Sequence, residues 1–182
     1  MSDDLKETKV SSKEIFKGRI LNVYCDEVLL PNGHKSTREL IRHCKASAVL
    51  AFDDSNNVIL EKQFRYPYND VLVEIPAGKA DKEEDPLITA KRELLEETGF
   101  EADDITLLGE YYPSVAYTDE VIYLYEARSL KKKEQHLDAD ESLSYYFVSF
   151  DEFKKMILDG KIKDGKTLAA LTYYLLKHGM ND

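Results

Sequence analysis

The first part of the chain alternates between hydrophobic and polar residues, a pattern that predicts strands rather than helices. The alternation runs through residues 20–30, breaks at Pro31-Asn32-Gly33-His34, and returns in residues 38–43. Asn-Gly is a strong hairpin signal, so the two runs are expected to form an antiparallel pair. Such a hairpin cannot bury both faces alone and must lie on the main domain or on a second subunit. The polar residues 1–13 are expected to be frayed.

The register of this hairpin bears on the two cysteines of the chain, Cys25 and Cys44. A two-residue turn would place Cys25 opposite Leu40 and Cys44 opposite Leu21. The two thiols would then lie roughly 13 Å apart along the strands. Because this separation is too large for a disulfide, both cysteines are expected to be reduced.

The rest of the chain mixes strand and helix patterns. The expected strands are residues 46–52, 58–64, 71–75, 105–108, 121–125 and 145–150. A helix capped by Asp151 is expected to run to Leu158, and a second helix covers residues 167–178. Its expected core side consists of Leu168, Leu171 and Leu175, which recur at helical spacing. The charged residues 131–142 predict an exposed loop.

One more helix is predicted from its end signals. Asp85 can cap it, Pro86 suits its first turn, and Gly99 can end it in a left-handed conformation. The helix therefore has roughly three turns. The strand-like run 71–75 leads into it through a glycine at residue 78.

Three carboxylates share one face of this helix. At about 100° per residue, Glu93, Glu96 and Glu97 lie together, and neighbouring like charges repel by roughly 0.2–0.5 kcal/mol per pair. The other side is expected to face the core and carries Leu87, Ile88, Leu94 and Leu95. Hard oxygen ligands of this kind suit Mg²⁺ or Mn²⁺. Taken alone, the pattern is more typical of a solvated acidic helix face.

Composition limits the possible partners. The chain has 182 residues, 43% of them hydrophobic, and a formal net charge of −10. This allows one compact domain with a real core, and the negative charge argues against nucleic acid or an anionic membrane as a partner. We find no apolar run long enough to span a membrane and no signal-peptide pattern in residues 1–12. A cytoplasmic protein is expected.

The acidic helix and its flanking glycines resemble the signature box of the Nudix hydrolases. The matching positions are Gly78, Glu84, Arg92, Glu93, Leu94, Glu96, Glu97, Gly99 and Phe100. The resemblance implies an α/β protein, namely the Nudix α/β/α sandwich with a mixed central sheet, and a small N-terminal antiparallel sheet. It divides the chain into an N-terminal strand and hairpin extension, residues 1–45, and a Nudix hydrolase domain, residues 46–182.

In this family the loop–helix–loop binds divalent metal and cleaves a diphosphate linked to another moiety. The resemblance therefore implies Mg²⁺, or alternatively Mn²⁺, as the cofactor. The implied ligands are Glu93, Glu97, Glu141 and the main-chain carbonyl of Ala77. Glu96 supports or shares the metal. Glu84 is auxiliary, and Arg92 orients the carboxylates.

Segments outside the box look like the ADP-ribose pyrophosphatase branch of the family. They are Arg38-Glu39, residues 63–67 and residues 71–78. Arg38 and Arg65 are the expected phosphate and base contacts, with a surface ion pair as the alternative for either. Glu74 is either a substrate contact or a buried partner for an arginine. Glu120 matches an acidic substrate-binding position.

Two positions depart from that branch. Ser114-Val115-Ala116 stands where the branch usually carries Ser-Pro-Gly, and Ala139 stands in place of the usual general base, a glutamate. Asp138 or Asp140 could substitute for that base, or a glutamate of the box could serve. The catalytic assignments are Glu96, Glu97 and Asp140.

The resemblance implies Mg²⁺-dependent hydrolysis of the diphosphate of ADP-ribose, to AMP and ribose 5-phosphate, or of related nucleoside diphosphate sugars. It also implies a homodimer in which the N-terminal sheets are exchanged. The altered loop motivates one alternative, a hydrolase of another nucleoside diphosphate derivative such as GDP-mannose, or of an oxidised nucleotide. Ala139 motivates another, a non-catalytic nucleotide-sugar sensor, although such a sensor has no reason to keep all four glutamates of the box.

Overall fold

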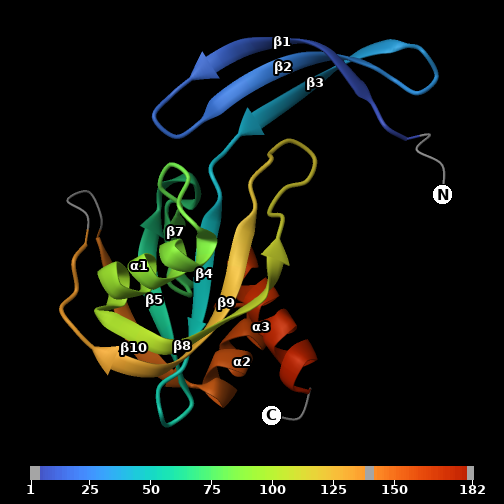
Figure 1. Ribbon diagram of the computed structural model, residues 1–182. Helices are drawn as coiled ribbons and strands as arrows, with labels where there is room; N and C mark the ends of the chain where they lie inside the picture. The colour runs from blue at the N-terminus through green and yellow to red at the C-terminus, as the bar shows by residue number, and fades with distance from the viewer. Residues whose placement is uncertain (1–4, 138–141, 180–182) are drawn as a thin grey trace. The chain divides into compact units, whose positions relative to one another are not determined.

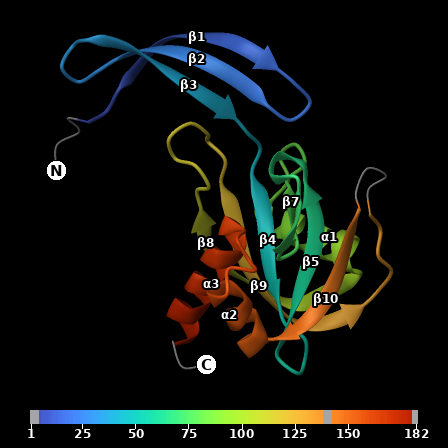
Figure 2. The ribbon, with the colours of Figure 1, turned by 180° about the vertical axis from the view of Figure 1, so that it is seen from behind.

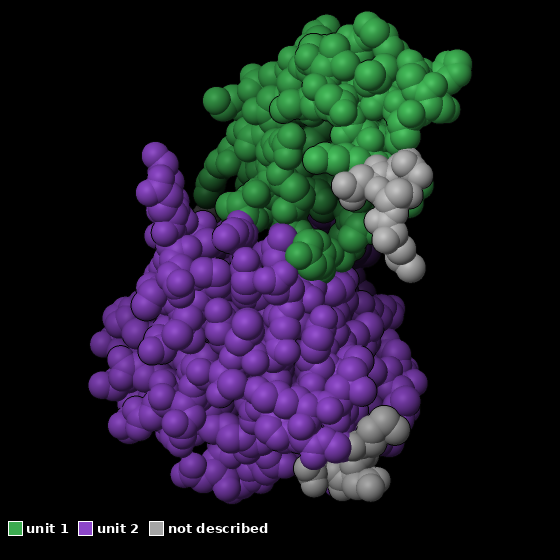
Figure 3. Space-filling view, turned by 45° about the vertical axis from the view of Figure 1, so that its right-hand side comes forward, with its two compact units in different colours: residues 1–44, 112–120 green, residues 45–111, 121–182 purple. Residues whose placement is uncertain are grey.

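The protein is described by a computed structural model that covers residues 5–137 and 142–179. The chain divides into two compact units, which we describe separately (Figure 3). Unit 1 contains residues 1–44 and 112–120, and unit 2 contains residues 45–111 and 121–182. Within the described residues, no helix is both long enough and apolar enough to cross a membrane.

Unit 1 is built on a three-stranded antiparallel sheet in the order β1-β2-β3 (Figure 1). The strands are β1 (Thr8–Lys17), β2 (Asn22–Leu29) and β3 (Lys35–Arg42). The expectation that residues 1–13 are frayed is wrong for Thr8 to Lys13, which pair with β2. An edge strand of this kind is held by its main-chain hydrogen bonds, so it needs no apolar pattern.

The hairpin between β2 and β3 has a three-residue loop, not the two-residue turn that was predicted. Its register places Cys25 opposite Glu39 instead of Leu40. Gly33 has φ +82°, and its amide donates to the carbonyl of Leu30 at 2.9 Å. A three-residue loop ending on a left-handed glycine is the next most common hairpin connection. Both cysteines are nevertheless free thiols, as predicted.

The loop of residues 112–120 belongs to unit 1 because it is bound to the end of β3. The Ile41 amide donates to the carbonyl of Tyr117 at 2.7 Å, and the Asp119 amide donates to the carbonyl of Ile41 at 3.2 Å. The Asp119 side chain also accepts hydrogen bonds from Arg42 at 3.0 Å and from the His43 amide at 2.8 Å. These bonds fix the conformation of the stretch that carries Glu120.

Unit 2 contains two sheets. A four-stranded mixed sheet has the order β7-β4-β9-β8, with β4 parallel to β9 and the other pairs antiparallel. A three-stranded antiparallel sheet has the order β10-β5-β6. The strands are β4 (Ala46–Ala51), β5 (Asn57–Arg65), β6 (Asp70–Glu74), β7 (Ala77–Lys79), β8 (Phe100–Tyr111), β9 (Ile122–Lys132) and β10 (Leu143–Ser149), with a short 3-10 helix at Tyr66–Tyr68.

Helices cover both faces of the mixed sheet, so the predicted α/β/α sandwich is confirmed (Figures 1 and 2). The helices are α1 (Pro86–Thr98), α2 (Phe150–Leu158) and α3 (Gly165–His178). Strand side chains alternate between faces. Ala48 and Leu50 of β4 therefore pack in the core that α2 and α3 cover, while Val49 packs with Ala90 and Leu94 of α1.

Several element boundaries differ from the sequence predictions by one or two residues, and three differences are more informative. β8 runs from Phe100 to Tyr111, far beyond the predicted 105–108, because it pairs with β9 along this whole length. β9 itself extends to Lys132, into the stretch predicted to be a loop. The α2 helix is capped by Ser149, whose hydroxyl accepts from the Glu152 amide, and not by Asp151.

Candidate metal and substrate site

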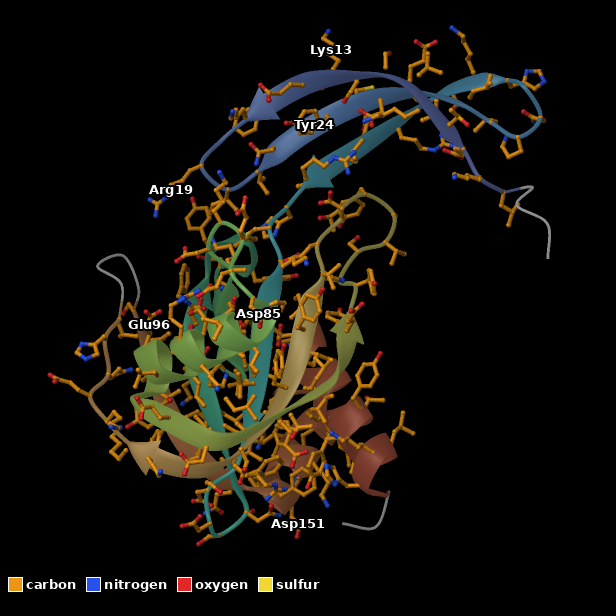
Figure 4. The ribbon with its side chains drawn as sticks, viewed as in Figure 1. Lys13, Arg19, Tyr24, Asp85, Glu96 and Asp151 are labelled. Atoms are coloured by element: carbon orange, nitrogen blue, oxygen red, sulfur yellow. The ribbon has the colours of Figure 1, made fainter. Side chains whose placement is uncertain are left out.

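The α1 helix begins and ends as its sequence predicts. The Asp85 side chain accepts a hydrogen bond from the Leu87 amide at 2.9 Å, and Pro86 occupies the first turn. Gly99 has φ +67°, and its amide donates to the carbonyl of Leu95 at 2.8 Å. Figure 4 labels Asp85 at the start of this helix and Glu96 in its last turn.

The buried face of α1 is rotated toward the carboxylates relative to the prediction. Ile88, assigned to the core, is 53% exposed, whereas Leu94 is buried as expected. Glu93 and Glu97 are only 7% and 2% exposed. They are therefore not part of a solvated acidic face. Two carboxylates taken out of water need charge partners or a bound cation nearby, since burying an unpaired charge is very costly.

The main chain of β7 holds these carboxylates. The Ala77 amide donates to Glu97 Oε2 at 2.8 Å. Glu93 lies so close to Gly78 that an added Cβ would sit 2.0 Å from its carboxylate. Residue 78 of the signature box must therefore be a glycine, because any side chain there would occupy the place of the Glu93 carboxylate.

We expect Gly78→Ala to lower turnover and the affinity for Mg²⁺ by roughly 10- to 100-fold, the usual effect of disturbing a residue that orients a metal ligand. The new methyl group would displace the Glu93 side chain, which can move, so the protein should still fold. Steady-state rates against Mg²⁺ concentration, with thermal melts, measure both effects. Gly109→Ala is the matched control because it crowds the Tyr173 ring instead. An unchanged Mg²⁺ requirement in Gly78→Ala would contradict the assignment of Glu93.

Arg92 binds three of the box carboxylates at once. It donates to both oxygens of Glu84 at 3.1 and 2.9 Å, and to Glu93 Oε1 and Glu96 Oε2 at 2.9 Å each. A further hydrogen bond of 2.9 Å reaches the carbonyl of Lys79. The pKa of Arg92 is raised further above its ordinary value, mainly because of the hydrogen bonds to Glu84. This geometry agrees with the predicted orienting role of Arg92.

Glu84 is held as a permanent anion by its neighbours. The hydrogen bonds from Arg92 lower the pKa of Glu84 to about 2, against the opposing effect of burial. The Asp81 amide and the Thr89 hydroxyl also donate to Glu84 Oε2, at 3.0 and 2.9 Å. Glu84 thus ties the loop before α1 to the helix, a supporting position that agrees with its predicted auxiliary role.

The oxygen atoms of the box fit a hard divalent cation. To complete its coordination, the cation needs ligands besides the described side chains. Within residues 5–137 and 142–179, no three His, Cys, Asp or Glu side chains are grouped closely enough to hold a metal ion by themselves. Glu93, Glu97 and the Ala77 carbonyl offer oxygen atoms, which Mg²⁺ prefers, and Mg²⁺ usually keeps several waters. The predicted ligand Glu141 and the predicted base Asp140 lie outside the described residues.

A second charged group surrounds Glu74, at the end of β6. Arg65 Nε and Nη2 donate to the two oxygens of Glu74 at 2.7 and 2.6 Å. Lys166 Nζ of α3 contacts Glu74 Oε2 as well. Burial would raise the pKa of Glu74, but Arg65 and Lys166 together lower it to about 2. Glu74 is therefore a buried partner of an arginine, one of the two predicted roles.

Arg65 and Glu74 line a pocket of about 240 Å³ together with residues of α3 and of the segment before it. The other lining residues are Tyr68, Leu72, Lys163, Asp164, Gly165 and Lys166. Lys166 was missed by the sequence analysis, because nothing in its local pattern links it to Glu74, 92 residues earlier. The sequence offers one sign, a charged residue in the first turn of an amphipathic helix. Only the structure shows that this lysine is buried, at 9% exposed.

The two remaining predicted substrate residues belong to unit 1. Arg38 of β3 pairs with Glu7 and donates to the carbonyl of Thr37 at 2.8 Å, so it forms a surface ion pair here. Glu120 lies 3.4 Å from His43 Nδ1, and its amide donates to the Thr118 hydroxyl at 3.2 Å. Their contact with substrate stays a prediction.

Comparison with known proteins identifies the family of the chain. The NUDIX domain profile matches residues 42–171, and the profile of the nucleoside diphosphate sugar hydrolase N-terminal domain matches residues 7–41. A methanol dehydrogenase activator of Bacillus methanolicus is 40% identical over 96% of both chains. An ADP-ribose pyrophosphatase of Bacillus subtilis is 38% identical over 97% of this chain and 96% of its own.

A solved structure of an ADP compounds hydrolase superposes with a TM-score of 0.86 at 21% identity, covering 98% of this chain and 99% of that one. This likeness supports the fold. The NUDIX domain match and the likeness to pyrophosphatases define the class of the protein, a hydrolase of phosphoanhydrides. The chain belongs to the Nudix hydrolase family, as its match to the NUDIX domain over residues 42–171 shows.

Proposed function

We propose that this protein hydrolyses the diphosphate of ADP-ribose, or of a related nucleoside diphosphate sugar, with Mg²⁺ as the cofactor and Mn²⁺ as an alternative. ADP-ribose would yield AMP and ribose 5-phosphate. The observation that carries the proposal is the pair of buried carboxylates, Glu93 and Glu97, set against the main chain of β7. The likeness to an ADP-ribose pyrophosphatase over nearly the full length supports the choice of substrate.

The residues have distinct roles in this proposal. Glu93, Glu97 and the Ala77 carbonyl, with Glu141, would hold Mg²⁺, which offsets phosphate charge and lowers the pKa of a bound water. Arg92 keeps Glu93 and Glu96 in place. The Arg65 fork would bind a phosphate of the substrate. Arg38 and Glu120 complete the predicted substrate-binding set, and Glu74 holds Arg65.

The general base is assigned to Asp140, with Asp138 or a box glutamate such as Glu96 as the alternative. We expect Asp140→Asn to lower kcat by roughly 10²- to 10⁴-fold with little change in KM, because a general base acts mainly in the transition state. A pH–rate profile of wild type and variant measures this, with Asp138→Asn as the matched neighbour. Full activity in Asp140→Asn would move the assignment to Asp138 or to the box.

The N-terminal residues 1–45 are proposed as the dimerisation element of a homodimer. Val10, Ile15 and Phe16 of β1 are 51%, 56% and 56% exposed, and all ten residues of this strand are exposed in one chain. Exposed apolar side chains on an edge strand are candidates for burial against a second subunit. Light scattering on the purified protein gives the mass, and a monomer at micromolar concentration would reject the dimer. We also propose a cytoplasmic location.

A hydrolysis panel with Mg²⁺ tests the function: ADP-ribose, GDP-mannose, UDP-glucose, NADH and a nucleoside triphosphate, with products separated by chromatography. AMP and ribose 5-phosphate from ADP-ribose are expected at the highest kcat/KM. Preference for another diphosphate would support the alternative substrate class. Tight binding without turnover would support the sensor.

The methanol dehydrogenase activator, 40% identical over 96% of this chain, favours a second candidate function, activation of a dehydrogenase. Adding the purified protein and Mg²⁺ to an alcohol dehydrogenase assay tests it. A rate increase that Glu97→Gln abolishes would link this effect to the hydrolase site.

A further inference from the structure

Lys166 is a buried cation whose partners connect two parts of the site. Its side chain is 10% exposed, and its Nζ contacts Glu74 and lies 3.1 Å from Asp164 Oδ1. Lysine is seldom buried unless it is paired, so this position calls for a reason beyond packing. It belongs neither to the signature box nor to the predicted substrate-binding residues.

The carboxylate of Glu74 is shared between Lys166 and Arg65. Two N–H groups of the planar Arg65 guanidinium donate to the two oxygens of Glu74, at 2.7 and 2.6 Å. In such a fork the plane of the carboxylate sets the plane of the guanidinium. Because Lys166 holds Glu74 Oε2 from α3, it helps to set the orientation of that carboxylate and, through it, of Arg65.

The first turn of α3 also holds the main chain next to Glu74. The Asp164 side chain accepts from the amide and the hydroxyl of Thr167, at 3.0 and 2.6 Å. The Thr167 hydroxyl in turn accepts from the Ile75 amide at 3.0 Å, and both residues are fully buried. The start of α3 therefore fixes the side chain of Glu74 and the main chain of Ile75 together.

The same stretch of main chain leads to the box. Ala77 lies three residues after Glu74, and its amide holds Glu97 Oε2 at 2.8 Å. Three extended residues span at most about 11 Å. Glu74, which binds Arg65, and Ala77, which binds Glu97, are thus at most about 11 Å apart along the main chain.

We propose that Lys166 is a positioning residue for substrate binding: through Glu74 it holds the Arg65 guanidinium in the orientation that binds a substrate phosphate. The inference rests on the proposed function, because it takes Arg65 as a phosphate contact. The pocket of about 240 Å³ beside Arg65, with Tyr68 and Leu72 in its wall, provides the space for that part of the substrate. Lys166 itself also lines this pocket, and in the proposal it acts on the substrate through Glu74 and Arg65.

Steady-state kinetics of Lys166→Met with ADP-ribose test the proposal. We expect KM to rise roughly tenfold, the effect of losing about one well-placed charged hydrogen bond, while kcat and the Mg²⁺ concentration for half-activation stay near wild type. Lys166→Arg should restore part of the affinity because it keeps the charge. Lys177→Met, an exposed lysine of the same helix, is the matched control. An unchanged KM in folded Lys166→Met overturns the proposal.

Leaving Glu74 with one partner fewer could prevent Lys166→Met from folding, so Glu74→Gln/Lys166→Met is the second variant. It removes one charge of each sign and is expected to fold with the same raised KM. A wild-type KM in this double variant also overturns the proposal.

Calorimetric titration with ADP-ribose in EDTA separates the inference from the proposed function, since it measures binding without turnover. Weaker binding by Lys166→Met supports the inference even if the wild type hydrolyses nothing, a result that would reject the proposed function alone. Equal binding by both proteins, or no binding by the wild type, overturns the inference.

Discussion

Glu97→Gln is expected to lower the turnover of ADP-ribose by roughly three orders of magnitude while the protein stays folded. The substitution removes the charge that would hold Mg²⁺, and a bound metal contributes several kcal/mol of transition-state stabilisation. It keeps an oxygen that can accept the hydrogen bond from the Ala77 amide, now 2.8 Å from Glu97 Oε2. Steady-state rates and a thermal melt measure the two parts of the prediction.

Glu152→Gln is the control for this change, because Glu152 is an exposed glutamate of another helix, α2. It removes the same charge without approaching β7 and should retain wild-type turnover. A folded Glu97→Gln protein with wild-type turnover would reject the metal assignment. A loss of turnover that follows a loss of folding would point to a structural role for Glu97 instead.

Arg92→Ala is expected to lower the free energy of unfolding by about 2–4 kcal/mol, because it leaves three carboxylates of α1 and its preceding loop without their shared cation. For a protein of this size the melting temperature should fall by roughly 5–15 °C. Glu84, Glu93 and Glu96 each lose a hydrogen bond of 2.9 Å. Thermal melts in EDTA and in Mg²⁺ measure the effect.

Mg²⁺ should raise the melting temperature of Arg92→Ala more than that of the wild type, because a divalent cation offsets the repulsion that Arg92 normally cancels. Lys91→Ala is the matched control: it removes a positive charge from the exposed side of the same helix. Equal melting temperatures for the two variants would show that the hydrogen bonds of Arg92 contribute little to stability.

Local features of the fold were predictable because they depend on neighbours in the sequence. The cap at Asp85 and the left-handed Gly99 set the length of α1, as predicted. Most strands were found for the same reason, through alternation over a few residues. The hairpin register was missed by one residue, since Asn32-Gly33 fits both a two-residue turn and the observed three-residue loop ending on Gly33.

The rotation of α1 could not be read from its helical wheel. Leucine and isoleucine favour a core face around Ile88, yet this residue is 53% exposed and Glu97 is 2% exposed. The neighbours decide the rotation, because the Ala77 amide and the open space at Gly78 receive the two carboxylates. The Ala77 amide at Glu97 and Arg92 at Glu93 help to compensate for the burial of charge.

The sequence by itself determined the chemical class of the site: four glutamates and an arginine, spaced along one loop and helix, with a glycine at each end. These relations span at most 23 residues and follow from helix geometry. Only the tertiary structure decided that Glu93 and Glu97 are buried and that Lys166 shares Glu74 with Arg65. Contacts between residues 92 positions apart depend on how helices and strands pack, which no local pattern specifies.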